Sequence, residues 1–179
     1  VVAAMRDPNP QSKKGGDALA AAGVRFDSGL LEAEARELNI GFVSRMTRGR
    51  PWVRMKIAAT LDGRTALANG KSQWITGPEA RQDGHRWRAR ACAILTGAGT
   101  VREDDPQLTV REVPTSRQPL RVVADSHLET PPQARILQGE KALVFAAVSG
   151  KSLPNAEIVV MPNAQGKVDL GKMLEELAR

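Results

Sequence analysis

Residues 76–97, TGPEARQDGHRWRARACAILTG, decide the fold, because they place a predicted helix directly before a predicted strand. Pro78 stands in the first turn and Glu79 follows Thr76 by three residues, which is a capping-box start for a helix over 78–89. The apolar run 91–96 is short and ends at a turn residue, as a buried strand does. The stretch therefore predicts a helix that feeds a sheet.

Similar apolar runs follow at 120–125, 142–147 and 158–161. No good helix is predicted between the first two strands, and the segment 169–179 has an apolar stripe at helical spacing. Strands that alternate with helices predict an α/β domain in which helices cover the sheet.

The residues before this domain predict a second body. We expect a buried strand over 1–5, a short helix over 17–23, a brief strand over 24–26 and one amphipathic helix over 30–46. The segment 12–16 is a candidate join between pieces of the chain.

The polar break Thr47-Arg48-Gly49-Arg50-Pro51 marks the expected boundary, which gives domains at 1–48 and 49–179. Beyond it, residues 52–58 alternate apolar and basic side chains. This pattern predicts a strand with one covered face and with Arg54 and Lys56 on the other.

Composition limits the function classes. The formal charge is +6, which suits nucleic acid, an anionic membrane surface or phosphorylated small molecules. Aromatic residues make up only 3% and tyrosine is absent, so the charge favours a small anionic ligand over nucleic acid. No apolar run of membrane-spanning length and no signal peptide are present, so we expect a cytoplasmic protein. The single cysteine, Cys92, is interpreted as a small hydrophobe in a strand.

Three loops concentrate polar groups: 58–76, 97–100 and 104–111. The first contains an Asp-Gly turn signal, so it predicts a plain hairpin with surface charges as well as it predicts a ligand-binding loop. The second resembles neither a complete dinucleotide fingerprint nor a Walker A loop, so a turn is the simpler interpretation. The third holds paired carboxylates, which suit acid–base work or a solvated turn. Arg81, His85 and Arg88 share a helix face that either binds phosphate or faces water, and a lone surface histidine there is usually inert.

Five segments in order resemble the riboflavin-biosynthesis reductase family: KIAATLDGRT at 56–65, SQWIT at 72–76, AILTGAGTV at 93–101, DDPQLTVR at 104–111 and PLRVVADS at 119–126. DPNP at 7–10 and residues 29–42 resemble the end of the deaminase domain to which this reductase is fused in bacteria. The resemblance covers nearly the whole chain.

The resemblance implies a dihydrofolate-reductase-like domain with a mainly parallel sheet, preceded by the last strand and helices of a cytidine-deaminase-like domain. It implies that NADPH reduces a ribosylaminopyrimidine 5'-phosphate to the ribitylamino compound. Residues that match cofactor positions are Ala58, Trp74, Thr100, Asp104 and Ser126. Residues that match substrate positions are Ser72, Arg88, Leu108 and Arg111. Lys56 either binds substrate or assists proton transfer, and is the candidate catalytic residue.

The family's deaminase motifs would precede Val1 and its glycine-rich cofactor loop would follow Arg179. We therefore expect no zinc site within this chain, zinc only in the deaminase domain of an intact protein, and a reductase domain that lacks its C-terminal portion. A homo-oligomer without membrane or nucleic-acid partners is expected, and a basic nucleic-acid-binding module is the alternative function.

Overall fold

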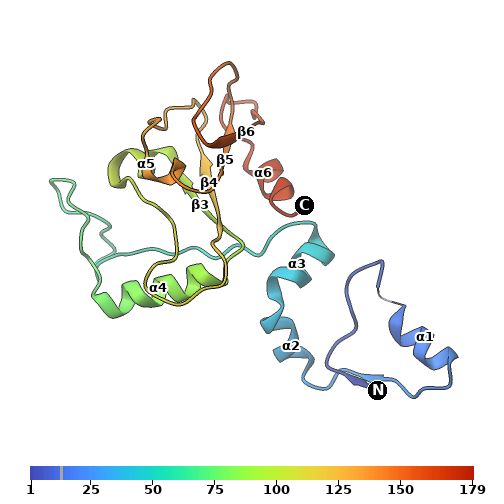
Figure 1. Ribbon diagram of the computed structural model, residues 1–179. Coiled ribbons are helices and arrows are strands. Elements are labelled where there is room, and N and C mark those ends of the chain that lie inside the picture. The colour runs from blue at the N-terminus through green and yellow to red at the C-terminus, as the bar shows by residue number, and fades with distance from the viewer. Residues whose placement is uncertain (13) are drawn as a thin grey trace. The chain divides into compact units, whose positions relative to one another are not determined.

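The computed structural model describes residues 1–12 and 14–179 (Figure 1). It divides into two compact units, one formed by Val1–Arg54 with Leu170–Arg179 and the other by Met55–Asp169. Lys13, which belongs to the candidate join, lies outside the described residues. The boundary at 47–51 stays a prediction.

The unit Met55–Asp169 is built on a four-stranded sheet. Its strands are β3 (Ala93–Gly97), β4 (Leu120–Ala124), β5 (Ala142–Ala146) and β6 (Ala156–Val160), in the spatial order β3-β4-β5-β6. All three pairings are parallel, with Ala93 opposite Leu120, Val122 opposite Leu143 and Ala142 opposite Ala156. The four predicted strands and the predicted α/β class with a mainly parallel sheet are confirmed.

The core explains why the middle strands are mostly apolar. Val122, Val123, Val144 and Phe145 are fully buried, so β4 and β5 are covered on both faces. Leu95 in β3 and Val160 in β6 are 42% and 45% exposed, as outer strands allow. The buried core that includes residues of β4 and β5 comprises Val101, Val123, Leu128, Ala134, Ile136, Leu137, Ala142, Val144, Ala146 and Leu153.

Helix α4 (Pro78–Arg90) precedes β3, as predicted, with proline in its first turn. Its start differs from the predicted capping box, because Gly77 is the N-cap and no side chain caps the helix. The carbonyl of Thr76 instead accepts a hydrogen bond from Nη1 of Arg81 at 2.8 Å.

Helix α5 (Ala98–Asp104) occupies the glycine-containing loop after β3, where a turn was predicted and no helix was expected. Val101, only 1% exposed, packs into the core from this helix. Tertiary burial thus overrides the weak helix propensity of Gly99 and Thr100. A 3-10 turn, η1 (Arg135–Leu137), lies between β4 and β5.

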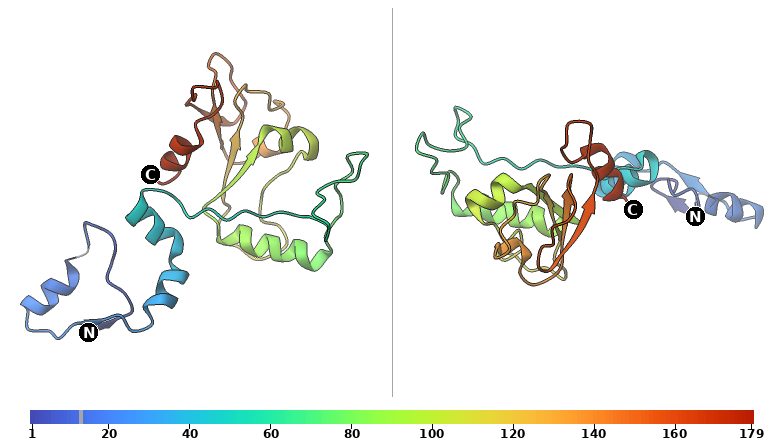
Figure 2. Two further views of the ribbon diagram at one scale, coloured as in Figure 1. Left: turned by 180° about the vertical axis from the view of Figure 1, so that it is seen from behind. Right: turned by 90° about the horizontal axis from the view of Figure 1, so that it is seen from above.

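The predicted strand at 52–58 is not formed. Met55 and Ile57 are 80% and 59% exposed, and none of the described strands pairs with this segment. A strand needs the backbone of a neighbour to satisfy its hydrogen bonds, which an alternating pattern alone cannot supply. The chain then makes turns at 60–64 and 67–71, and this part projects from the sheet in every view (Figures 1 and 2).

The other unit contains β1 (Val2–Ala3) and β2 (Asp27–Ser28), paired in parallel, and the helices α1 (Gly15–Ala21), α2 (Glu32–Leu38), α3 (Ile40–Arg48) and α6 (Leu170–Glu176). The predicted strand over 1–5 is shorter and not buried, and the one at 24–26 lies at 27–28.

The single helix predicted over 30–46 is two helices. Asn39 interrupts it, since its side-chain Nδ2 donates to the carbonyl of Ala35 at 2.9 Å and so competes with the helical backbone. Helix α6 joins this unit through Arg50, whose Nη2 lies 3.0 Å from Oε1 of Glu175.

Candidate functional site

An open cleft of about 660 Å³ lies beside α5. Its described lining consists of Ala66, Gly70, Lys71, Ser72, Gln73, Gly99, Thr100, Glu103 and Asp104. The hydroxyl of Ser72 lies 3.4 Å from Oδ1 of Asp104, so the first and third polar loops of the sequence meet here. One predicted substrate residue, Ser72, and two predicted cofactor residues, Thr100 and Asp104, line one cleft.

The third loop leads from this cleft to helix α4. Nη1 of Arg88 donates to the carbonyl of Thr109 at 2.7 Å, and Nη1 of Arg111 donates to the hydroxyl of Thr109 at 3.0 Å. Both predicted substrate arginines therefore converge on Thr109. Burial lowers the pKa of Arg88 and neighbouring Arg111 lowers it further, while Glu112 opposes this. Two guanidiniums whose charges repel form a favourable place for a dianion.

His85 belongs to the same cluster, although a surface position was predicted. Only 5% of it is exposed, its Nδ1 accepts the backbone N–H of Arg111 at 3.2 Å, and its Nε2 lies 3.7 Å from Oε1 of Glu112. Burial lowers its pKa, as do Arg88 and Arg111, and Glu112 raises it. The signal in the sequence was the face shared with Arg88, but helix periodicity alone does not say whether that face meets water or a loop.

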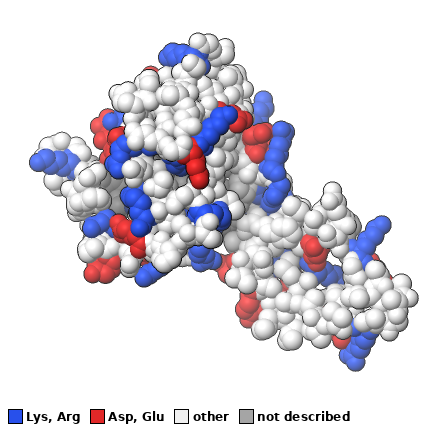
Figure 3. All heavy atoms as spheres, viewed as in Figure 1, with Lys and Arg blue, Asp and Glu red and all other residues white. Residues whose placement is uncertain are grey.

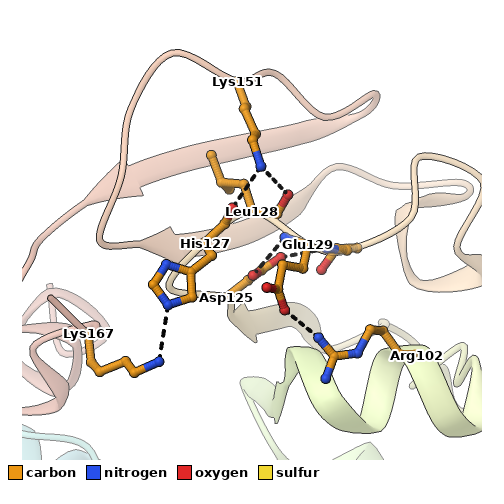
Figure 4. Close-up of polar contacts among 8 residues, drawn as sticks. Arg102, Asp125, His127, Leu128, Glu129, Lys151 and Lys167 are labelled. Atoms are coloured by element: carbon orange, nitrogen blue, oxygen red, sulfur yellow. Dashed lines mark hydrogen bonds and ion pairs between the residues drawn. The ribbon is translucent and has the colours of Figure 1, made fainter.

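A further polar cluster follows β4 (Figure 4). The carboxylate of Asp125 is 1% exposed and accepts the backbone N–H groups of Glu129 at 2.9 Å and Thr130 at 2.7 Å. Burial raises the pKa of Asp125, but these donors outweigh it and the pKa is lowered overall. Lys167 points its Nζ at Nε2 of His127, 3.1 Å away.

Ser126, which follows Asp125 in this cluster, anchors the loop after β6. Its hydroxyl oxygen accepts the backbone N–H of Val168 at 3.1 Å. Thr100 and Ser126 follow the carboxyl ends of β3 and β4, which are neighbouring parallel strands. They therefore lie at the same edge of the sheet, where ligands of open α/β sheets bind.

The other predicted site residues are less enclosed. Lys56 is exposed and Ala58 half-buried, both in the segment that is not a strand. Trp74 is 71% exposed and its ring lies 4.4 Å from the guanidinium carbon of Arg81. Leu108 packs its side chain against the core and has a positive φ of 55°.

Cys92 is exposed, which corrects its expected burial in a strand, because β3 begins one residue later.

Charged side chains are mixed on the surface. The face in Figure 3 shows acidic groups interspersed among the basic ones, and several arginines are paired, such as Arg102 with Glu129 and Arg36 with Glu32. This distribution gives no support to the nucleic-acid-binding alternative. Across residues 1–12 and 14–179, no helix is long and apolar enough to cross a bilayer.

A four-stranded parallel sheet with a polar cleft and a basic cluster at its loops defines an α/β domain. The model of the RibD C-terminal domain matches residues 51–179, and the chain belongs to that family. It is 41% identical to the riboflavin biosynthesis protein RibD of Escherichia coli over its whole length and 53% of the relative. It is 48% identical to RibD of Aquifex aeolicus, over 79% of the chain and 40% of the relative.

The structural comparison agrees. A deaminase/5-amino-6-(5-phosphoribosylamino)uracil reductase from Thermotoga maritima matches with a TM-score of 0.89 and 33% identity, covering 99% of the chain and 50% of that protein. This confirms the expected reductase fold and the resemblance to the fused deaminase/reductase. The chain spans about half the length of the relatives it matches.

Proposed function

We propose that the chain supplies the reductase part of a riboflavin-biosynthesis enzyme, in which NADPH reduces 5-amino-6-(5-phosphoribosylamino)uracil to its ribitylamino 5'-phosphate. The observation that carries the proposal is the convergence of Arg88 and Arg111 on the loop whose other end, Asp104, faces Ser72 across the cleft. A phosphate subsite and a polar cleft are thereby joined by one short segment of chain.

The basic end of this loop suits the substrate phosphate. Arg88 and Arg111 provide charge-assisted donors, and a planar guanidinium matches two phosphate oxygens at once. Ser72 adds a neutral hydrogen bond within the cleft. Leu108 lies between the two ends of the loop and shapes the backbone there through its positive φ.

The cofactor fits the carboxyl edge of the sheet. Thr100, Asp104 and Ser126 offer two hydroxyls and a carboxylate to the hydroxyl and amide groups of NADPH, with Trp74 as an aromatic surface and Ala58 as a small neighbour. When bound, NADPH supplies the hydride, and the protein's task is to hold it against C1 of the sugar and exclude competing reactions. Lys56 binds substrate or assists proton transfer as the sugar ring opens.

The remaining assignments concern the longer protein. Residues 1–48 are proposed to be the end of a deaminase domain, with 49–179 as the reductase portion, and zinc is assigned only to the deaminase. Across residues 1–12 and 14–179, no group of three or more His, Cys, Asp or Glu side chains is placed to hold a metal ion. Cytoplasmic location and a homo-oligomeric state stay predictions.

The experiment follows the absorbance of NADPH in the intact protein with the phosphorylated substrate and with its dephosphorylated analogue. We expect oxidation of NADPH with the first and at least about tenfold lower kcat/KM with the second, because each charge-assisted hydrogen bond to phosphate contributes about 1.5–3 kcal/mol. Equal turnover of both compounds would remove the phosphate subsite, and no oxidation of NADPH would reject the proposed activity.

A further inference from the structure

His85 is a buried group that the proposed reaction does not use. It lies on α4 one turn before Arg88 and is enclosed by Arg88, Arg111 and Glu112, with 5% of its surface exposed. A buried polar side chain is tolerated when its hydrogen bonds are made, and Nδ1 makes one to the backbone of Arg111 at 3.2 Å.

The backbone of 109–111 is held from two sides. On one side, two residues of α4 bond it: Arg88 donates to the carbonyl of Thr109, and His85 accepts the N–H of Arg111. On the other side, the side-chain amide of Gln118 accepts the N–H of Val110 at 2.8 Å and donates to the carbonyl of Val110 at 3.2 Å. In extended chain the polar groups of successive residues point to opposite sides, so α4 and Gln118 together fix this segment as a neighbouring strand would.

The hydrogen bond defines the charge and tautomer that His85 needs. Because Nδ1 accepts, it carries no proton, and the ring proton lies on Nε2, toward Glu112. The lowered pKa, which burial causes first and the charges of Arg88 and Arg111 reinforce, keeps the ring in that neutral form. A cationic ring would lose the bond and add a third positive charge to the cluster.

We propose that His85 is a positioning residue: its unprotonated Nδ1 anchors the backbone of Arg111 and so orients the guanidinium that binds the substrate phosphate. The inference deepens the proposed function and rests on it for the identity of the phosphate. It assigns His85 no proton transfer to the substrate.

The test compares His85→Leu, His85→Asn and His85→Gln in the full chain. Leucine removes the acceptor, asparagine keeps an oxygen at the position of Nδ1, and glutamine places its amide near Nε2 instead. Gln82→Ala, on the exposed part of the same helix, is the control. Three quantities are measured: Kd for ribose 5-phosphate by calorimetry, hydrogen exchange of the Arg111 amide by NMR, and steady-state KM and kcat.

Loss of one hydrogen bond corresponds to a few-fold change, so His85→Leu should weaken ribose 5-phosphate binding and raise substrate KM by about three- to tenfold. The KM for NADPH and kcat should stay within about twofold, because the cofactor cleft is untouched. Exchange of the Arg111 amide should accelerate. His85→Asn should restore both binding and slow exchange, His85→Gln should not, and Gln82→Ala should match the wild type. In an Arg111→Ala background, His85→Leu should weaken binding no further.

Equal behaviour of His85→Leu and His85→Asn at equal melting temperature would overturn the inference, as would unchanged Arg111 exchange in His85→Leu. Failure of the wild type to bind ribose 5-phosphate would also overturn it. Binding that depends on His85 as described, in a protein that never oxidises NADPH, would retain the positioning role and reject only the reductase activity.

Discussion

At the scale of single residues, the arrangement of Arg88 makes a kinetic prediction. Its Nη1 donates to the Thr109 carbonyl, and we propose that the rest of the guanidinium binds the substrate phosphate. Arg88→Ala should lower kcat/KM for the substrate by at least about tenfold, since a charged hydrogen bond contributes about 1.5–3 kcal/mol. NADPH affinity should hardly change. Steady-state kinetics with each reactant varied separately measures both.

The control for that prediction is Arg86→Ala, because Arg86 stands on the same helix with an exposed side chain that contacts Asp83 and Gln82. It should leave kinetics unchanged. An Arg88→Ala enzyme with normal kcat/KM for substrate would show that Arg88 is structural and outside the phosphate site.

His85 also predicts how stability depends on pH. Its pKa is lowered in the folded state by burial, so the unfolded chain binds a proton near pH 6.5 while the folded chain does not. The contribution of neutral His85 to the free energy of unfolding is therefore complete above about pH 6.5, the pKa in the unfolded chain. It is lost as the pH falls toward the lower pKa of the folded chain, at about 1.4 kcal/mol per pH unit between these two pKa values.

Urea unfolding at a series of pH values from about 7.5 to 5 tests this. His85→Asn should flatten the dependence in that window, whereas His127→Asn, at the other and exposed histidine, should retain it. The same slope in wild type and His85→Asn would contradict the assignment.

At the scale of elements, the sheet predicts different costs for the same substitution in different strands. Val144 in β5 is fully buried and Val160 in β6 is 45% exposed. Val144→Ala should lower the free energy of unfolding by about 2–3 kcal/mol, through lost burial and a cavity. Val160→Ala should change it by about 0.5 kcal/mol or less. Denaturant titration of both variants measures the difference, and equal costs would mean that β6 is covered in solution.

At the scale of the whole molecule, the net charge of +6 comes from 26 basic and 20 acidic residues, and the two kinds are interspersed on the face that Figure 3 shows. We therefore predict that a random oligonucleotide binds no more tightly than a Kd of about 10⁻⁴ M at physiological salt, the weak end of non-specific binding. Fluorescence anisotropy at several salt concentrations measures this. Micromolar affinity with a steep salt dependence would revive the nucleic-acid alternative.

The sequence by itself determined the α/β class, the four strands and helix α4, because each depends on local patterning: short apolar runs for buried strands, and proline and acidic residues for a helix start. Its resemblance to the reductase family also made Ser72, Asp104, Arg88 and Arg111 candidates for one site.

Tertiary structure alone decided where local pattern and environment disagree. The alternation at 52–58 has strand character but no partner among the described strands, and the loop after β3 became α5 because Val101 is buried in the core. It also decided that His85 is buried and bonded to Arg111, because whether a helix face meets water or a loop depends on residues 26 positions away in the chain. Spacing along a chain fixes which side chains share a face, and only the packing of distant segments fixes what that face touches.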